Sequence, residues 1–357
     1  MFTYKWNLKD LEKVEKNGYT VFSCFAGGGG SSQGYKMAGY EVIGCNEIDP
    51  RQMEIYKHNL KPKYSYLEDI RTFRLRDDLP KELFELDILD ASFPCSLFST
   101  SNTRADDKKG KEVKFREGQA TQTLDDLAFE TIKLVDKIKP KICVFENVKG
   151  LLQEKNKWYV QQIYKQFESI GYKICHYLKD CADFGVPQRR KRVFFFAVRN
   201  DINVPTGDIF GCEPMLNINY MDKHIPYKEI EEYNMKDGTV KVYPTALKWW
   251  KLTKPGKYFA DACELETGSR NYMDYLKIDK NKVLGTITAH VNGGGSYHYD
   301  IPRTLTDLEI RKASSFPLDY NFLEENPKYV CGMSVPPLAM YRISKEIQIQ
   351  WLDKNVH

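Results

Sequence analysis

Apolar and polar positions divide the first two hundred residues into short apolar runs and longer segments with helical spacing. The short runs are rich in β-branched and aromatic residues, which favour strands, whereas the longer segments repeat apolar residues at helical intervals. The predicted strands are 19–25, 41–46, 86–91, 141–145, 172–178 and 192–198, and the predicted helices are 31–38, 52–60, 124–138 and 159–170. This alternation predicts an α/β fold whose mostly parallel sheet is covered by helices on both faces.

The pattern changes after Asn200. From there to about Lys282 the sequence is rich in Tyr, Asn, Lys and turn residues and shows no regular period, so we expect a second, smaller and irregular domain. The adjacent Trp249 and Trp250 are interpreted as core residues of that domain. Regular patterns return near Lys282, and a final helix is expected at 337–351.

Composition limits the class of protein. Hydrophobic residues make up 42% of the 357 residues and charged residues 29%, which is typical of a globular chain. No apolar run approaches the roughly 18 residues that span a bilayer, and the N-terminus lacks the apolar stretch of a signal peptide. Nine cysteines without a C-x-x-C pair argue against a disulfide framework and a clustered zinc site, so we expect no metal and a cytoplasmic location.

The first candidate site is the segment Phe25-Ala-Gly-Gly-Gly-Gly30, which lies between a predicted strand and a predicted helix. Glycines let the backbone turn sharply there and approach a ligand closely. Glu47 ends the next strand, 20 residues beyond Gly27, where a carboxylate accepts hydrogen bonds from ribose hydroxyls. The order of strand, glycines, helix, strand and acid favours an adenosine cofactor, and leaves NAD and S-adenosyl-L-methionine both open.

Three further candidates follow predicted strands. Cys95 comes after Pro94 at the end of the apolar run 86–91, and as a thiolate it would be a nucleophile. Glu146 ends the strand at 141–145, on the same expected edge of the sheet as Cys95. Arg190 and Arg192 are two residues apart before an apolar strand, so on an extended chain they would point to one side.

These motifs together resemble the DNA cytosine-C5 methyltransferase family. The glycine loop, Pro-Cys, Glu-Asn-Val, Gln-x-Arg-x-Arg and Gly332-Met-Ser-Val-Pro336 occur in the order of that family, over about 19–199 and 283–350. The resemblance implies a Rossmann-like methyltransferase sheet that uses S-adenosyl-L-methionine. Ser96, Ile48 and Met333 depart from the Gln, the aromatic residue and the Asn that the family often has at these positions.

The resemblance also implies roles for single residues. Cys95 would add to C6 of a flipped-out cytosine, Glu146 would contact N3 and the exocyclic amine, and Arg192 would hold O2, with Arg190 close by. The cofactor would be bound by Phe25, Gly27, Gly29, Glu47, Ile48, Asp69, Pro94 and Ser334. The family's layout implies a catalytic domain at 1–199 plus 330–357, a target recognition domain at 200–282, and a hinge and supporting segment at 283–329.

The implied partner is double-stranded DNA, and a cognate restriction endonuclease is a further expected partner. The basic segment 100–121 matches the family's mobile catalytic loop, and Arg270 is one candidate for base-edge or phosphate contacts. One site per chain makes a monomer sufficient, and we expect it near the nucleoid. Three alternatives stay open: a tRNA cytosine-C5 methyltransferase, which would need little recognition domain, a catalytically silent DNA-binding relative, and a Rossmann-type dehydrogenase.

Overall fold

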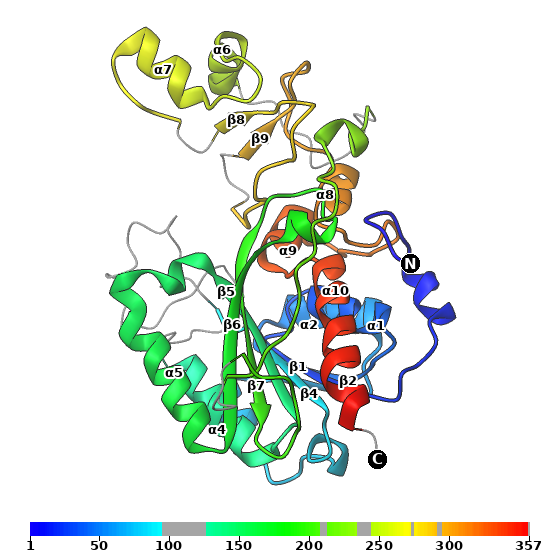
Figure 1. The fold of residues 1–357 in the computed structure, drawn as a ribbon. Helices are drawn as coiled ribbons and strands as arrows, with labels where there is room; N and C mark the ends of the chain where they lie inside the picture. Colours follow the sequence, from blue (N-terminus) through cyan, green and yellow to red (C-terminus); the bar gives the residue numbers. More distant parts are fainter. Residues whose placement is uncertain (95–125, 208–212, 234–243, 273–274, 291–294, 356–357) are drawn as a thin grey trace. The chain divides into compact units, whose positions relative to one another are not determined.

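The chain folds into two compact units, each built from more than one segment of the sequence. The computed structural model describes residues 1–94, 126–207, 213–233, 244–272, 275–290 and 295–355, drawn in colour in Figure 1. One unit, which we name the sheet unit, contains 13–179, 191–219 and 340–357. The second unit contains 1–12, 180–190 and 220–339.

A seven-stranded sheet in the order β3-β2-β1-β4-β5-β7-β6 forms the centre of the sheet unit. The neighbours from β3 to β5 are parallel, and β7 runs antiparallel to β5. The strands are β1 (Thr20–Cys24), β2 (Glu41–Glu47), β3 (Tyr64–Leu67), β4 (Ile88–Ala91), β5 (Ile142–Val148), β6 (Tyr172–Asp180) and β7 (Lys191–Arg199). The predicted α/β fold with a mostly parallel sheet is therefore confirmed.

Helices cover both faces of this sheet because successive strand residues point to opposite sides. On β7, Phe195 stacks on Phe145 in a large core shared with α4 and α5, whereas the next residue, Phe196, contacts Trp351 on the other face. Figure 1 shows α4 and α5 on one side of the sheet and α10 on the other. The helices are α1 (Gly30–Met37), α2 (Pro50–Leu60), α3 (Ile70–Phe73), α4 (Leu127–Ile138), α5 (Lys157–Ser169) and α10 (Pro337–Ile347), followed by a π turn at Gln348–Leu352.

The second unit has its own small core. Trp249 is 7% exposed and packs with Phe259 and Tyr297, while the Trp250 indole donates to the His298 carbonyl at 2.8 Å. Both tryptophans therefore pack as the sequence predicted. The elements of this unit are α6 (Pro244–Leu252), α7 (Phe259–Thr267), β8 (Tyr275–Lys277), β9 (Gly295–Tyr297), α8 (Asp307–Ala313) and α9 (Pro327–Met333).

The structure differs from the sequence-based expectation in three places. The segment 200–282 was expected to be irregular, yet it contains α6 and α7, each only nine residues long and therefore with too few turns for a clear period. Strand β3 and helix α3 were not predicted, because each has only four residues. The two units also do not coincide with the expected domains, which stay predictions: 200–219 belong to the sheet unit, and 1–12, 180–190 and 283–339 to the second unit. None of the described helices is long and apolar enough to cross a membrane.

Candidate functional site at the carboxyl edge of the sheet

Three neighbouring parallel strands, β1, β4 and β5, end at the same edge of the sheet. The chain leaves β1 towards β2 on one side, whereas β4 continues to β5 on the other. This is the point where strand order reverses, and ligands bind outside the carboxyl ends of strands at such points. The glycine loop follows β1, the Pro94 segment follows β4, and Glu146 lies two residues before the end of β5.

The glycine loop between β1 and α1 has an unusual backbone. Phe25, Gly27 and Gly29 all have positive φ, at 53°, 50° and 74°. A Cβ on Gly29 would clash with Leu60 and Tyr56, so this position also needs glycine for close packing. No described atom lies within 4 Å of where a Cβ on Gly27 would stand. The loop is thus closely packed at Gly29 and open at Gly27, which leaves backbone accessible to a ligand.

Glu47 is hydrogen-bonded to the loop from the end of β2. Its Oε2 accepts from the Gly27 amide at 2.7 Å, and its Oε1 accepts from the amides of Ile48 and Asp49 at 2.8 and 2.9 Å. Burial raises the pKa of this carboxyl, and these three amide hydrogen bonds act in the opposite direction. Glu47 and Ile48 therefore lie beside the glycine loop, as an adenosine-binding role requires.

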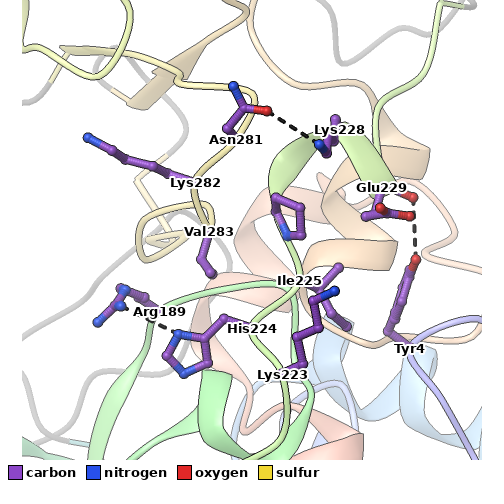
Figure 2. A pocket seen from close by; sticks show the side chains of 11 residues that line it. Tyr4, Arg189, Lys223, His224, Ile225, Lys228, Glu229, Asn281, Lys282 and Val283 are labelled. Atoms are coloured by element: carbon purple, nitrogen blue, oxygen red, sulfur yellow. Dashed lines mark hydrogen bonds between the residues drawn. The ribbon is translucent and has the colours of Figure 1, made fainter.

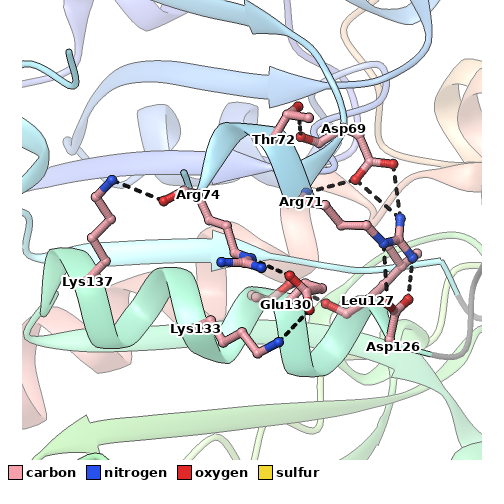
Figure 3. A network of polar contacts seen from close by, with 10 residues as sticks. Asp69, Arg71, Thr72, Arg74, Asp126, Leu127, Glu130, Lys133 and Lys137 are labelled. Atoms are coloured by element: carbon pink, nitrogen blue, oxygen red, sulfur yellow. Dashed lines mark hydrogen bonds and ion pairs between the residues drawn. The ribbon is translucent and has the colours of Figure 1, made fainter. Parts of the chain in front are cut away.

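Asp69 is part of a polar network between α3 and α4, shown in Figure 3. It is the N-cap of α3, where its Oδ1 accepts from the Arg71 amide at 2.8 Å. The Arg71 guanidinium lies 3.0 Å from Asp69 Oδ2 and also pairs with Asp126, the N-cap residue of α4. Arg71 therefore fixes the orientation of the Asp69 carboxylate, which is one of the predicted cofactor ligands.

The end of β4 leads to the predicted nucleophile. Pro94 is the last described residue of this segment, and Cys95 lies outside the described residues, as does the predicted catalytic loop at 100–121. The cysteines that the structure does describe are all buried: Cys24, Cys45, Cys143, Cys175, Cys181, Cys263 and Cys331. Burial raises the thiol pKa of five of them, Cys24, Cys45, Cys143, Cys175 and Cys331, which makes them poor nucleophiles.

Glu146 and Arg192 form an ion pair at this edge. Strands β5 and β7 are antiparallel, with Val148 opposite Arg192, so the two side chains meet, and Arg192 Nε lies 2.6 Å from Glu146 Oε1. Their side chains are only 14% and 12% exposed. Glu146 Oε1 nevertheless makes no hydrogen bond of good geometry with any described residue. A buried carboxylate oxygen in this state is suited to accept a hydrogen bond from a ligand.

Two hydrogen bonds connect the end of β5 around Glu146 to the segment after β4. The Glu146 amide donates to Ser92 Oγ at 3.2 Å, which connects β5 to the segment that leads to Cys95. Asn147 is 1% exposed, and its side-chain amide donates to the Phe93 carbonyl at 3.5 Å. The sequence analysis did not single out Ser92 or Asn147 as functional, although Asn147 lies within the Glu-Asn-Val motif that it quoted.

Arg190 has a different environment from Arg192. It belongs to the second unit, is 3% exposed, and donates to the carbonyls of Ile287 and Gly332 at 3.2 and 3.0 Å. Two residues earlier, Gln188 is equally buried and accepts from the Ile287 amide at 2.9 Å. These contacts organise the second unit itself, and they give no support to the predicted catalytic role of Arg190.

The remaining predicted contacts also lie in the second unit. Ser334 caps α9, and its hydroxyl donates to the Val330 carbonyl at 2.8 Å, so its role at a cofactor stays a prediction. Arg270 pairs with Asp261 and Glu264, which occupy its guanidinium. Among the residues that the structure describes, no cluster of His, Cys, Asp or Glu is arranged to hold a metal ion.

An open cavity of about 840 Å³ lies within the second unit, and four of its eleven lining residues are Lys or Arg. Figure 2 shows Arg189 directed at His224, with the Arg189 guanidinium 3.5 Å from the imidazole Nδ1, and Lys228 directed at Asn281. The charged side chains in the lining are Arg189, Lys223, Lys228, Lys282 and Glu229. Arg189 and Lys282 also lie 3.7 and 3.6 Å from Asp180 and Asp279, so the attraction of the cavity for an anion comes mainly from Lys223 and Lys228.

Comparisons with known proteins identify the family of the chain. The family model described as C-5 cytosine-specific DNA methylase matches residues 19–349. The Type II methyltransferase M.FnuDI of Fusobacterium nucleatum is 34% identical over 94% of this chain and 96% of that protein. The Type II methyltransferase M.Bsp6I of Bacillus sp. (strain RFL6) is 27% identical over 92% of this chain and 98% of that protein.

Solved structures show the same fold. A DNMT2 variant of Spodoptera frugiperda aligns with a TM-score of 0.65 at 17% identity, over 92% of this chain and 99% of that chain. The methyltransferase EhMeth of Entamoeba histolytica aligns with a TM-score of 0.61 at 17% identity, over 96% of this chain and all of that chain (100%). The predicted Rossmann-like methyltransferase sheet is confirmed.

Proposed function

The chain belongs to the C-5 cytosine-specific DNA methylase family and takes its methyl group from S-adenosyl-L-methionine, and from this premise we propose how its residues act. The substrate is a cytosine turned out of duplex DNA, and the reaction passes through a covalent bond between Cys95 and C6 of the base. A base inside the stack could not present C6 to a side chain at this edge, which is why the proposal includes base flipping.

The observation that carries the proposal is the Glu146–Arg192 pair. The Watson–Crick edge of cytosine presents an exocyclic N4 donor, the N3 acceptor and the O2 acceptor. A carboxylate beside a guanidinium matches this edge, because Glu146 accepts from N4 and stabilises a proton on N3, while Arg192 donates to O2. Glu146 Oε1 makes no well-formed hydrogen bond to a described residue, so it is available for the amine.

The same two side chains assist addition of the thiolate. When Cys95 adds to C6, electron density moves through the ring towards N3 and O2, where a proton shared with Glu146 and the Arg192 guanidinium stabilise the developing charge. C5 thereby becomes nucleophilic. After C5 is methylated, a base removes the C5 proton, the bond between C6 and the sulfur breaks, and Cys95 is regenerated.

The residues around the glycine loop fit the methyl donor. When bound, S-adenosyl-L-methionine supplies an electrophilic methyl group on a sulfonium. Glu47 would accept from the ribose hydroxyls, Asp69 would accept from the adenine amine, and Ile48 would pack on the adenine, with contacts also from Phe25, Gly27, Gly29, Pro94 and Ser334. The open backbone at Gly27 and the buried carboxylate beside it are the local features that support this assignment.

Contacts to DNA are assigned to several regions. The segment 200–282 would read the target sequence, and the cations of 100–121 would contact phosphates. The basic cavity of the second unit, which contains Lys223 and Lys228, is also suited to phosphate groups. Because the relatives carry Type II names, we include a cognate restriction endonuclease among the proposed partners. A monomer is sufficient for one site, and a cytoplasmic location beside the nucleoid stays a prediction.

Bisulfite sequencing of DNA from cells that express the chain tests the proposed function. We expect protected cytosines at one recurring sequence, and we expect that Cys95→Ala removes the protection completely while the protein still binds S-adenosylhomocysteine. Methylation by the Cys95→Ala variant would overturn the assignment of the nucleophile. Absence of protected cytosines with a folded wild-type protein would overturn the proposed activity on DNA.

A further inference from the structure

A carboxyl group that the mechanism does not use lies beneath the glycine loop. Asp90 is in the middle of the sheet on β4 and is 1% exposed. Its Oδ2 accepts from the Ser23 hydroxyl at 2.9 Å, and its Oδ1 accepts from the Ser31 hydroxyl at 3.2 Å. Each oxygen of one buried carboxylate is thus engaged by a different serine.

The two serines lie on either side of the glycine loop. Ser23 is two residues before Phe25, on β1, and Ser31 follows Gly30 in the first turn of α1. Between them the backbone takes a positive φ at Phe25, Gly27 and Gly29, and such a conformation is costly for a phenylalanine. Asp90 therefore hydrogen-bonds to one residue before the loop and to one residue after it, and so holds both ends of the loop.

The strand alternation explains why the carboxyl group reaches this place. Leu89 and Ala91 point into the large core on the face covered by α4 and α5, so Asp90 points to the opposite face, towards α1. Ser23 is its direct neighbour on β1, in register. An apolar side chain here would avoid the cost of burying a carboxylate, which argues that the group serves more than the stability of the core.

We propose that Asp90 is a positioning residue that holds the glycine loop in the shape that binds the methyl donor. The inference rests on the proposed role of that loop. Asp90 touches neither substrate nor reacting atoms in this account. It acts through Ser23 and Ser31 on the backbone between them, so its removal should weaken donor binding more than it slows the chemical step.

The opposite end of the same two strands offers a matched control. Asp87 is 6% exposed just before β4, and its Oδ2 accepts from the Thr20 amide and hydroxyl on β1 at 2.8 and 3.1 Å. Asp87 and Asp90 therefore make similar contacts between the same strands, but Asp87 lies at the edge away from the glycine loop. If Asp90 had a purely structural role, replacing Asp90 and replacing Asp87 would have the same effect on donor binding.

The experiment compares Asp90→Asn, Ser31→Ala and Asp87→Asn in the full chain. The dissociation constant of S-adenosylhomocysteine is measured by calorimetry, and KM for S-adenosyl-L-methionine and kcat are measured on substrate DNA. We expect Asp90→Asn to raise the dissociation constant and KM by about tenfold and to lower kcat by less than threefold. Ser31→Ala should raise both by a smaller factor, and Asp87→Asn should change neither by more than twofold.

A pH profile separates positioning from a packing defect. Burial raises the pKa of Asp90 to about 7, with a smaller contribution from the charge of Glu146 and against the hydrogen bonds from Ser23 and Ser31. The other titratable groups that face Asp90 are Cys24, Cys143 and Tyr35, whose own raised pKa values keep them neutral below pH 9. The protonated acid has one fewer free acceptor for the serines, so wild-type affinity for S-adenosylhomocysteine should fall as the pH drops through about 7. Asp90→Asn should lack this component, and Glu146→Gln should shift it to lower pH.

Two results would overturn the proposal. One is a folded Asp90→Asn protein whose dissociation constant stays within twofold of wild type, and the other is an Asp87→Asn protein that loses as much affinity as Asp90→Asn. If Asp90→Asn fails to fold, the same judgement is made on Ser31→Ala, which keeps the carboxylate. Failure of the proposed function is recognised separately, because the wild-type protein would then leave cytosines unmethylated even at saturating donor.

Discussion

The amino and carboxyl edges of the sheet both carry carboxylates and guanidiniums, but the surroundings of these groups differ. At the amino edge, Asp87 accepts from Thr20 and pairs with Lys141 at 2.7 Å, and the exposed Arg199 holds Asp201 through two hydrogen bonds of 2.6 and 2.9 Å. At the carboxyl edge the carboxyl groups of Glu47, Asp90 and Glu146 are buried, and the backbone of the adjacent loop is strained. Asp87 is buried too, and both oxygens of Glu47 and of Asp90 are already hydrogen-bonded. What marks the carboxyl edge is its strained loop and Glu146 Oε1, which makes no well-formed hydrogen bond with a described residue.

The two ends of strand β7 each carry an ion pair, so the same comparison can be drawn within one element. Arg192 Nε lies 2.6 Å from Glu146, and Arg199 Nε lies 2.6 Å from Asp201, at opposite ends of the strand. The side chains of the first pair are 14% and 12% exposed, and those of the second are 30% and 60% exposed. Distance alone therefore does not identify a functional pair. Burial and an oxygen without a well-formed hydrogen bond do so, because exposed ion pairs are screened by water.

Among substitutions at the two edges of the sheet that the structure describes, the largest effect on activity is expected at Glu146. Glu146→Gln keeps the shape of the side chain but removes its charge and its ability to stabilise a proton on N3. We expect kcat to fall by roughly 10²–10⁴, the range for general acid–base assistance. Asp201→Asn, at the amino edge, is the control and should keep kcat within twofold. Equal rates for Glu146→Gln and wild type in a methyl-transfer assay would remove Glu146 from the mechanism.

The next effect is expected at the guanidinium of the same pair. Arg192→Ala removes the donor to O2 of the base, and losing one donor to a developing oxyanion costs about 10²–10³ in kcat. Arg199→Ala removes a guanidinium at the same distance from its carboxylate, but at the other end of β7, and should leave kcat near wild type. Single-turnover kinetics at saturating donor distinguish the two, and equal losses would show that the effect comes from the strand rather than from the site.

A smaller effect, on stability, is expected at the two ends of β1. Gly18 and Gly29 both have positive φ, but a Cβ on Gly18 meets no described atom, whereas one on Gly29 meets Leu60 and Tyr56. Gly18→Ala should therefore lower the free energy of unfolding by about 1 kcal/mol, from backbone strain alone. Gly29→Ala adds overpacking and should lower it by about 3 kcal/mol. Urea unfolding measures both, and equal losses would contradict the close packing at Gly29.

Much of this edge was predictable from the sequence. Glycines after an apolar run, an acid at the end of the next run and a Glu at the end of KICVF are local signals, and parallel strands bring their carboxyl ends together. The contact between Glu146 and Arg192 was not predictable from spacing, since it depends on the antiparallel register of β5 and β7. Asp90 was missed because nothing in the run 86–91, which also contains Asp87, distinguishes it from an acid of an ordinary strand.

The pair Arg190 and Arg192 shows what residue spacing leaves open. Their spacing predicts that both point to one side of an extended segment, and this stays a prediction; it does not indicate that β7 begins at Lys191, between the two. Arg190 lies before the strand and binds the carbonyls of Ile287 and Gly332, which are 97 and 142 residues away in sequence. Contacts of that range depend on the tertiary fold, so no local pattern could have separated the two arginines.

Trapping of the covalent intermediate tests the central claim most directly. Duplex DNA that carries 5-fluorocytosine at the target, incubated with the protein and S-adenosyl-L-methionine, should give a protein–DNA adduct that survives denaturation, because C5 then has no proton to lose. Digestion and mass spectrometry should place the modified nucleotide on Cys95. An adduct on another residue, or a methylating protein that forms no adduct, would contradict the account.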